Sequence, residues 1–552
     1  MRIVLPPVLV LFLGIPLTGW AMGHMHDDLD VRLDPDQHVL QGHATLRFTE
    51  LPDHGTIRVQ VHADFTVEEI QVNGDPLDFW EETIETQNSP SGEVRQRVIR
   101  IELSDEEVRR PPVTLRLSYH GQMHDPPRAA PGLRFVRPDY TAGYIDPEGV
   151  YLPGESRWHP QVPNTLATYT LSVTLPAGWE SVTSGRERSR TMTDGLFTTV
   201  WEVETPLDAL TLAANRFVKA QRVWRDIEIA AYLFPEHASL AEQYLQATQR
   251  YLEVYTRLLG PYPFPKFAVV ENFFPSGLGF PSFTLLGHRV IQRGYTQPYA
   301  LGHEIVHSWF GNSVFNAVTQ GNWVEGLTTY LANYLYEERF GTPSKARRLR
   351  QRMVHEYSLY ASPDLEYPLT QFHYKERPLD NAIGYQKAAM VFHMLRREIG
   401  DEAFFRGVRM LVEEWTGRQA AWSDLQQVFE RASGEDLTWF IKQWVQRPGA
   451  PQITIARPTV QAEPSGDSPR GVWVQLPFVQ SRPPYRVRTD VEFLLSANRV
   501  IRVPVTLTRG RQTLAVWMPE PPRRLRLHPA LHYTLLPIRR RRRSLSYSPR
   551  RS

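Results

Sequence analysis

The feature that most constrains this chain is the segment Gly-His-Glu-Ile-Val-His-Ser-Trp-Phe-Gly-Asn at residues 302–312. If residues 297–310 form a helix, His303 and His307 lie four positions apart and share one face. Two imidazoles in that arrangement can bind one zinc ion from the same side. Glu304 is offset by one position and suits a general base acting on a water beside the metal. The alternative is an ordinary amphipathic helix that happens to carry these three residues.

A second helix is predicted further along the chain, where apolar residues keep helical spacing over residues 323–340. Glu325 stands near its start, separated from His307 by seventeen residues. Packed against the first helix, the second would bring Glu325 in as a third ligand. Two histidines and one glutamate leave a fourth position open for water, as a catalytic zinc site requires. The alternative role for Glu325 is a carboxylate that stabilises a helix N-terminus.

These two motifs carry a family resemblance. The pattern His-Glu-x-x-His-x-Trp-Phe-Gly-Asn from His303, followed by Trp-x-Glu-Gly from Trp323, resembles the gluzincin family of aminopeptidase N and leukotriene A4 hydrolase. The gap before the third ligand is one residue shorter than is usual in that family, which implies a deletion in the connecting loop. The resemblance implies one zinc ion (Zn2+) per chain, held by His303, His307 and Glu325, with Glu304 as the catalytic base.

A further candidate lies in the helix predicted over residues 381–399. The segment Ile-Gly-Tyr-Gln-Lys-Ala-Ala-Met from Ile383 resembles the family's Tyr-Glu-Lys-Gly segment. In that family the tyrosine donates a hydrogen bond to the oxyanion of the tetrahedral intermediate. The resemblance therefore makes Tyr385 the candidate for this role, and a phenol is a suitable preorganised donor. Without the resemblance, Tyr385 is simply an aromatic residue of a helix that packs in the core.

The loop at residues 273–283 departs from the family pattern. The family's aminopeptidases carry Gly-x-Met-Glu-Asn here, and its glutamate binds the free α-amino group of the substrate. An acidic group is needed because an ammonium entering a partly dry pocket is costly unless it is paired. The corresponding residues Gly277, Leu278, Gly279 and Phe280 include no carboxylate, and Glu271 lies before the loop, near the end of a predicted strand. These four residues are predicted to contact an extended peptide through their backbone; alternatively, the loop only packs.

The pattern of segments predicts a multi-domain α+β protein, because 552 residues exceed what one core holds. Alternating segments over residues 24–220 predict an N-terminal antiparallel β-sandwich or saddle. Residues 221–450 are predicted to be mostly helical, and the resemblance implies a thermolysin-like zinc metallopeptidase catalytic domain. Over residues 451–537 the β-pattern returns and predicts a small C-terminal β-sandwich. We therefore do not expect the large helical C-terminal domain of many family members in residues 451–552.

The two ends of the sequence indicate where in or outside the cell the protein is expected. Residues 1–23 read as a signal peptide, with Arg2, an apolar run and then small residues near a plausible cleavage point. The expectation is export to the periplasm or the cell exterior; the alternative is an uncleaved N-terminal segment that anchors the chain in the inner membrane. The chain has no cysteine, so disulfides are excluded. Residues 538–552 are predicted to be a basic disordered tail, with weak contact to an anionic membrane surface as an alternative.

Composition narrows the function classes. The formal net charge is only +2, which argues against a polyanionic partner, so no nucleic acid is expected. The leading hypothesis is a zinc-dependent peptidase acting on a peptide or protein substrate. The missing amine-binding glutamate leaves exopeptidase and endopeptidase action equally open. The alternatives are a catalytically inactive peptide-binding scaffold that retains the fold, and hydrolysis of a non-peptide bond at the same metal. The oligomeric state is left open.

Overall fold

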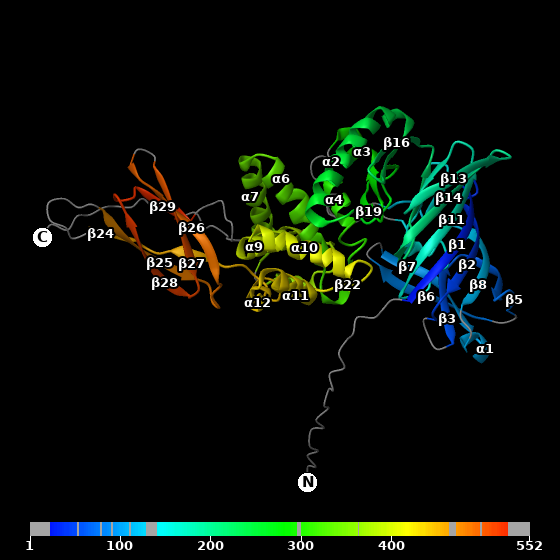
Figure 1. Ribbon diagram of the computed structural model, residues 1–552, viewed down its shortest axis with the longest axis horizontal. Coiled ribbons are helices and arrows are strands. Elements are labelled where there is room, and N and C mark those ends of the chain that lie inside the picture. Colours follow the sequence, from blue (N-terminus) through cyan, green and yellow to red (C-terminus); the bar gives the residue numbers. More distant parts are fainter. Residues whose placement is uncertain are drawn as a thin grey trace, which may run out of the picture.

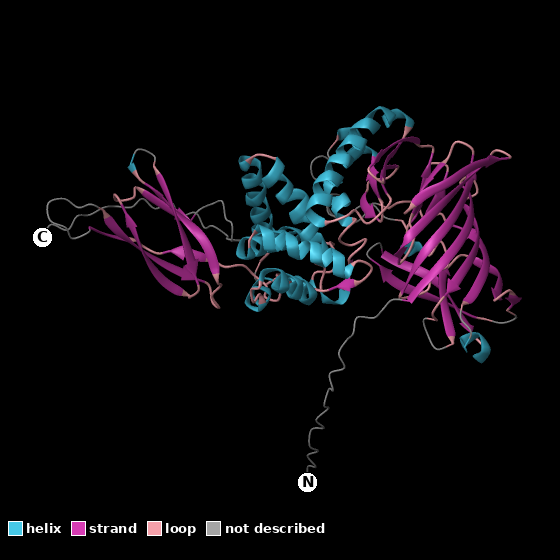
Figure 2. Ribbon diagram, viewed as in Figure 1, coloured by secondary structure: helices cyan, strands magenta, loops and turns pink. Residues whose placement is uncertain are grey.

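The computed structural model describes residues 23–51, 55–77, 80–89, 92–109, 112–128, 141–294, 300–362, 364–462, 471–496 and 499–527. Three regions follow one another along the long axis of the molecule: an N-terminal β region, a central helical region and a C-terminal β region (Figures 1 and 2). This arrangement confirms the predicted fold class. The predicted basic tail, and the predicted signal peptide as far as residue 22, lie outside the described residues.

The N-terminal region is built on an eight-stranded sheet with the order β13-β14-β11-β1-β2-β8-β4-β5. Its strands are β1 (Gly23–Asp34), β2 (Val39–Phe48), β4 (Thr66–Val72), β5 (Asp75–Pro76), β8 (Val113–Gln122), β11 (Thr165–Pro176), β13 (Arg186–Thr193) and β14 (Leu196–Leu207). Neighbouring described strands run antiparallel except β1 and β11, which are parallel. The prediction of antiparallel pairing is wrong for this pair, because alternation of apolar residues does not record strand direction.

Two smaller sheets complete this region. One has the order β3-β7-β6 and the other β12-β15-β10-β9. Their elements, with one short helix, are β3 (Thr56–His62), β6 (Glu81–Ser89), β7 (Gly92–Glu102), α1 (Asp105–Arg109), β9 (Tyr144–Asp146), β10 (Gly149–Leu152), β12 (Glu180–Val182) and β15 (Leu212–Asn215). Apolar side chains from the large sheet and both small sheets share one core, which includes Val59, Leu115, Val150 and Trp158.

The central region contains a five-stranded sheet with the order β16-β17-β18-β20-β19. The strands are β16 (Val218–Trp224), β17 (Ile227–Leu233), β18 (Lys266–Asn272), β19 (Gly277–Phe280) and β20 (Phe283–Gly287). Strand β16 runs across the predicted domain boundary at residue 220. Strand β19 is the last in the order and forms the edge of the sheet. The segment at 277–280 was predicted as part of a loop; the structure corrects this to a strand.

Helices make up the rest of the central region, together with the two-residue strands β21 (Phe315–Asn316) and β22 (Gln419–Ala420). The α-helices are α2 (Ala241–Leu259), α3 (His288–Arg293), α4 (Leu301–His307), α5 (Val324–Thr328), α6 (Tyr336–Phe340), α7 (Pro343–Tyr360), α8 (Pro378–Asp380), α9 (Ala388–Ile399), α10 (Asp401–Trp415), α11 (Trp422–Ser433) and α12 (Thr438–Trp444). Short 3-10 turns lie at Gly154–Ser156, Pro235–Leu240, Val318–Gln320 and Leu369–Gln371. Two helices that the sequence predicted as continuous each contain a π-helical segment, at Thr329–Leu335 and Asn381–Lys387.

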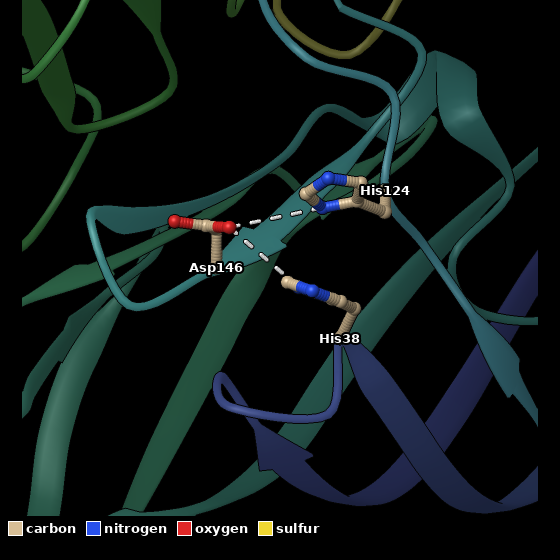
Figure 3. Close-up of side chains that lie close together, drawn as sticks. All are labelled: His38, His124 and Asp146. Carbon is tan, nitrogen blue, oxygen red and sulfur yellow. Dashed lines mark ion pairs between the residues drawn. The ribbon is translucent and has the colours of Figure 1, made fainter.

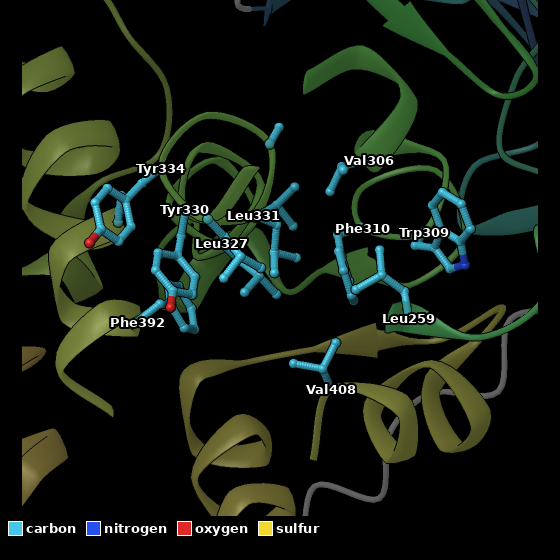
Figure 4. Packing of buried hydrophobic residues seen from close by; sticks show 14 of the residues in the cluster. Leu259, Val306, Trp309, Phe310, Leu327, Tyr330, Leu331, Tyr334, Phe392 and Val408 are labelled. Carbon is cyan, nitrogen blue, oxygen red and sulfur yellow. The ribbon is translucent and has the colours of Figure 1, made fainter. Parts of the chain in front are cut away.

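One hydrophobic core holds these helices in place. Val306 and Phe310 of the α4 segment are buried in the same cluster as Leu327 and Leu331, which follow Glu325 along the chain (Figure 4). Close backbone approach also matters, because a Cβ at Gly326 would overlap Ala388 of α9. The glycine thus lets α5 lie directly against α9. The segments that carry His303, Glu325 and Tyr385 are therefore fixed by packing rather than by the loops between them.

The C-terminal region consists of two small sheets with their own core, which includes Val474, Leu476, Phe493 and Leu507. The strands are β23 (Ile453–Ile455), β24 (Thr459–Ala462), β25 (Val472–Gln480), β26 (Val487–Leu494), β27 (Val500–Leu507), β28 (Arg511–Met518) and β29 (Arg524–Leu527). Tyr485 joins the core of the central region, so the two regions pack directly on each other. Among the described helices, none has both the length and the apolar composition needed to cross a membrane.

Candidate active site

Helices α4 and α5 bring three potential metal ligands to one point. His303 Nε2 and His307 Nε2 are 3.1 Å apart. Glu325 Oε2 lies 3.4 Å from the first of these nitrogens and 3.5 Å from the second. In a tetrahedral zinc site with bonds of about 2.0–2.2 Å, neighbouring ligand atoms are roughly 3.3 Å apart. The structure thus places the two histidines and the glutamate in the arrangement that their spacing in the sequence predicts.

The chemistry of this donor set fits a zinc ion. Glu325 Oε2 is buried and makes no ordinary hydrogen bond to any described residue. A buried carboxylate oxygen without a partner is costly, and a dication between it and the two imidazoles removes that cost. His307 Nδ1 lies 3.0 Å from the Phe310 carbonyl, which favours the tautomer with a lone pair on Nε2. The set of two histidines and one carboxylate also leaves a position for water or substrate.

The electrostatics around His307 also favour binding of a divalent cation. Burial alone lowers the pKa of His307, but the Glu325 and Glu304 carboxylates outweigh it and raise the pKa to about 9. The pKa of Glu325 is held well below its usual range; burial acts to raise it, and the two imidazoles overcome that effect. The site therefore concentrates negative potential at the ring nitrogens, which attracts a divalent cation in place of a proton.

Glu304 projects beside the three ligands, toward the edge strand β19. A Cβ at Gly279 would overlap Glu304 Oε2 and would also lie 3.7 Å from His307 Cβ. The glycine therefore lets the backbone of β19 pass directly over the carboxylate. This contact joins two predicted features, the base on α4 and the segment that we expect to bind substrate.

All four predicted substrate-contact residues lie in β19. The strand pairs with β20 in antiparallel register, with Gly277 opposite Leu286 and Phe280 opposite Phe283. Leu278 O accepts a hydrogen bond from Thr284 Oγ1 at 2.9 Å. Because β19 is an edge strand, its outer backbone groups are available to pair with an extended peptide.

Tyr385 lies in the π-helical segment that precedes α9, with its ring 6.4 Å from that of His303 and nearly parallel to it, at 16°. Burial raises the pKa of Tyr385 well above its usual value, and the carboxylates of Glu325 and Glu304 raise it further. The phenol is therefore protonated at neutral pH and can act as a hydrogen-bond donor beside the ligand set. Gly384 makes room for the neighbouring ring of Phe372, which contacts Tyr385 edge-on at 6.0 Å.

Glu271 is not available to anchor a substrate amine. Its side chain is fully buried in β18, where Oε2 accepts a hydrogen bond from Phe234 N at 2.9 Å. Oε1 lies 2.6 Å from His237 Nδ1. Both carboxylate oxygens are thus committed to neighbours inside the protein.

Two residues with a part in this site were missed by the sequence reasoning. Lys375 reaches the site from the segment before α8, with Nζ 4.8 Å from the centre of the Tyr385 ring. Burial lowers the pKa of Lys375, opposed by the nearby charges of Glu325 and Glu304. Asn322 links the start of α5 to the loop that carries Lys375. Its Oδ1 accepts a hydrogen bond from Val324 N at 3.0 Å, and its Nδ2 donates one to His373 O at 3.0 Å. The position of Asn322 just before a predicted helix could have indicated a capping role, because asparagine is favoured there. No sequence pattern indicated Lys375.

Residues 294–444 match the peptidase family M1 domain. The family and its solved members imply a zinc cofactor, as the donor set does.

Several known proteins similar to this chain are aminopeptidases by name. The alanine/arginine aminopeptidase of Saccharomyces cerevisiae is 24% identical over 321 residues, or 53% of this chain and 36% of the yeast protein. Aminopeptidase N of Lactococcus lactis is 27% identical over 169 residues, or 28% of this chain and 19% of that protein. The chain thus spans only about a third, or less, of the length of these curated relatives.

Solved structures share the fold. An M1 zinc metallopeptidase from Deinococcus radiodurans matches with a TM-score of 0.59 and 22% identity, covering 78% of this chain and 94% of that one. Aminopeptidase A of Legionella pneumophila, in complex with aspartic acid, matches with a TM-score of 0.66 and 19% identity, covering 89% of this chain and 56% of that one. At this level of identity the likeness establishes the fold.

Proposed function

We propose that this protein is a zinc-dependent peptidase that hydrolyses peptide bonds. The observation that carries the proposal is the convergence of His303, His307 and Glu325 within 3.5 Å of one another, with Glu304 beside them under the edge strand β19. A scaffold that only binds peptides needs neither a ligand set with an open position nor a carboxylate next to it. The family match and the relatives named aminopeptidases support the same reaction class.

Each residue then has a defined role. Zinc held by His303, His307 and Glu325 would supply a Lewis acid that polarises the scissile carbonyl and acidifies water. Glu304 accepts the proton of the attacking water as the new C–O bond forms, and returns it to the amine nitrogen as the C–N bond breaks. The Tyr385 hydroxyl donates a hydrogen bond to the oxygen on which negative charge develops. The backbone of β19 aligns the peptide across Glu304.

The charge around the site bears on which end of a peptide is recognised. Strand β19 carries no carboxylate, Glu271 is committed to His237, and the Lys375 ammonium lies close to the Tyr385 ring. A free α-amino group next to the scissile bond would therefore meet a like charge rather than an acidic anchor. We propose that the enzyme cleaves peptides bound along β19 and that it turns over single-residue aminoacyl substrates weakly.

The function test compares substrates that differ in their N-terminus. The purified protein is incubated with a mixed peptide pool and, separately, with aminoacyl anilides, and the products are identified by mass spectrometry. We expect cleavage of the pool, with little release of free amino acids from the anilides. Rapid anilide turnover would contradict the proposed preference, while bound zinc without cleavage of any peptide would favour the inactive scaffold.

Replacing Lys375 tests the charge argument directly. In Lys375→Met, the ratio of kcat/KM for a peptide with a free N-terminus to that for its acetylated form should rise about tenfold. A tenfold change corresponds to about 1.4 kcal/mol, a normal size for one charge pair in a partly buried site. Lys442→Met, on the exposed face of α12, is the matched control and should leave the ratio unchanged. An unchanged ratio in Lys375→Met would remove Lys375 from the account of specificity.

Location and partners are also part of the proposal. The N-terminal apolar run supports export to the periplasm or the cell exterior. The partner we propose is a peptide or protein substrate in that compartment. Fractionation of cells followed by N-terminal sequencing of the mature chain would check both the compartment and the removal of the leader.

A further inference from the structure

We propose that His38, His124 and Asp146 form a second divalent-cation site, in the N-terminal β region. Among the described residues, two groups of three His, Asp or Glu side chains are arranged to hold a metal, and this is the group outside the active site. The three residues come from separate segments: the β1–β2 turn, the segment just after β8, and strand β9 (Figure 3). A bound ion would therefore cross-link three parts of the chain.

The geometry is close to that of a metal site without its ion. Asp146 Oδ2 lies 3.7 Å from His38 Nδ1 and 3.9 Å from His124 Nδ1. The two imidazole rings lie 3.9 Å apart between centroids, and one potential ligand atom from each residue falls within 4.8 Å of the others. Neighbouring ligands on a tetrahedral ion are separated by roughly 3.3 Å. The candidate ligand atoms are farther apart than this, so the side chains must rotate toward one another to bind an ion.

The surroundings hold the three side chains in this position. His38 takes a left-handed backbone conformation, with φ of 62°. Its Nδ1 lies 2.8 Å from the Ile145 carbonyl, so Nδ1 carries the proton and Nε2 is the ring nitrogen left to bind an ion. His124 forms a backbone bridge with Tyr144, and their rings are 5.0 Å apart. The Tyr144 hydroxyl hydrogen-bonds the Asp146 carboxylate. Carbonyl and hydroxyl partners of this kind orient the ligands of metal sites.

The residue types and exposure select the class of ion. Two imidazoles and one carboxylate suit zinc and similar transition metals, and they suit magnesium or calcium poorly, because those ions prefer oxygen ligands. The side chains of His38, His124 and Asp146 are 31%, 38% and 20% exposed, so an ion can enter and water can complete its coordination. A hydrogen-bonded cluster without metal is the alternative, and the test below separates the two.

The site also connects to the substrate strand. The Tyr144 ring packs 5.8 Å from that of Phe273, which directly follows β18 and leads into β19. A Cβ at Gly149 would overlap the same Phe273 ring. An ion that fixes β9 would thus support the segment from which the peptide-binding edge begins, without taking part in the reaction.

The experiment counts zinc in variants that separate the two sites. After dialysis in zinc-containing and then metal-free buffer, mass spectrometry of the metal content should give two zinc ions per chain for the wild-type protein. His303→Ala/His307→Ala should retain one, and adding Asp146→Asn and His124→Ala should remove it. One ion in the wild type and none in the His303→Ala/His307→Ala protein would overturn the second site. That result would leave the proposed peptidase function intact, so the two failures are distinguishable.

A matched control and a second readout guard against misfolding. His120 on β8 pairs with Glu68 at 3.3 Å but has no second imidazole in that pair, so His120→Ala should retain two ions. In His303→Ala/His307→Ala, added zinc should raise the melting temperature, because a ligand bound only by the native state stabilises it. The same addition should not stabilise the protein that also carries Asp146→Asn and His124→Ala. Equal stabilisation of both proteins by zinc would contradict the proposal.

Discussion

Glu304→Gln should lower kcat for peptide hydrolysis about a thousandfold and leave the zinc content unchanged. Glutamine keeps the size of the side chain but cannot accept the proton of the attacking water. General base catalysis contributes about 10²–10⁴-fold to such reactions, so most of the turnover should disappear. The ligand atoms of His303, His307 and Glu325 are separate from the Glu304 carboxylate, so the metal should stay bound. Steady-state kinetics on a cleaved peptide, with metal analysis of the same sample, checks both statements.

The control for this substitution is Glu402→Gln on α10, where the side chain is 91% exposed and remote from the ligands. It should have wild-type activity. Residual activity above one tenth of wild type in Glu304→Gln would show that another group takes the proton. Loss of zinc together with activity would show instead that the substitution disrupts the ligand set and does not isolate the base.

The prediction of the active site from sequence depended on local periodicity. His303 and His307 are four residues apart on a short helix, so their proximity follows from helix geometry alone. Glu325 required one further step, the packing of a second amphipathic helix, which the apolar spacing at Leu327 and Leu331 indicated. The assignment of Tyr385 rested on a family resemblance. The resemblance supplied the role, while the structure shows a helix aromatic whose ring lies near that of His303.

Other features could not be predicted, because they depend on contacts between distant segments. The parallel pairing of β1 with β11 leaves no trace in the alternation of residues. Strand β19 is short and rich in glycine, so its composition indicates a loop, and only pairing with β20 makes it a strand. The cluster of His38, His124 and Asp146 joins three segments that are far apart in the sequence. Lys375 comes from a segment more than forty residues after Glu325 and Tyr385 from one further on, and Asn322 bonds the backbone of the Lys375 segment at His373.

Gly279→Ala should lower kcat about a hundredfold without unfolding the protein. A methyl group at this position overlaps Glu304 Oε2, so either the base or the β19 backbone must move. A displacement of about 1 Å at the reacting groups commonly costs about 10²-fold. Gly279 does not have a left-handed φ, so alanine fits the backbone and the melting temperature should not fall. Peptide kinetics and thermal unfolding of the variant give the two measurements.

Gly277→Ala is the matched control, because it lies two residues away on the same edge strand and an added Cβ there meets no atom within 4 Å. Its activity should stay within about twofold of wild type, since a surface substitution without a contact has little effect. If both alanine variants lose activity equally, the cause is the stiffness of β19 and not the contact with the base. If both remain active, β19 does not position Glu304, and the alignment of the peptide over the carboxylate must come from another element.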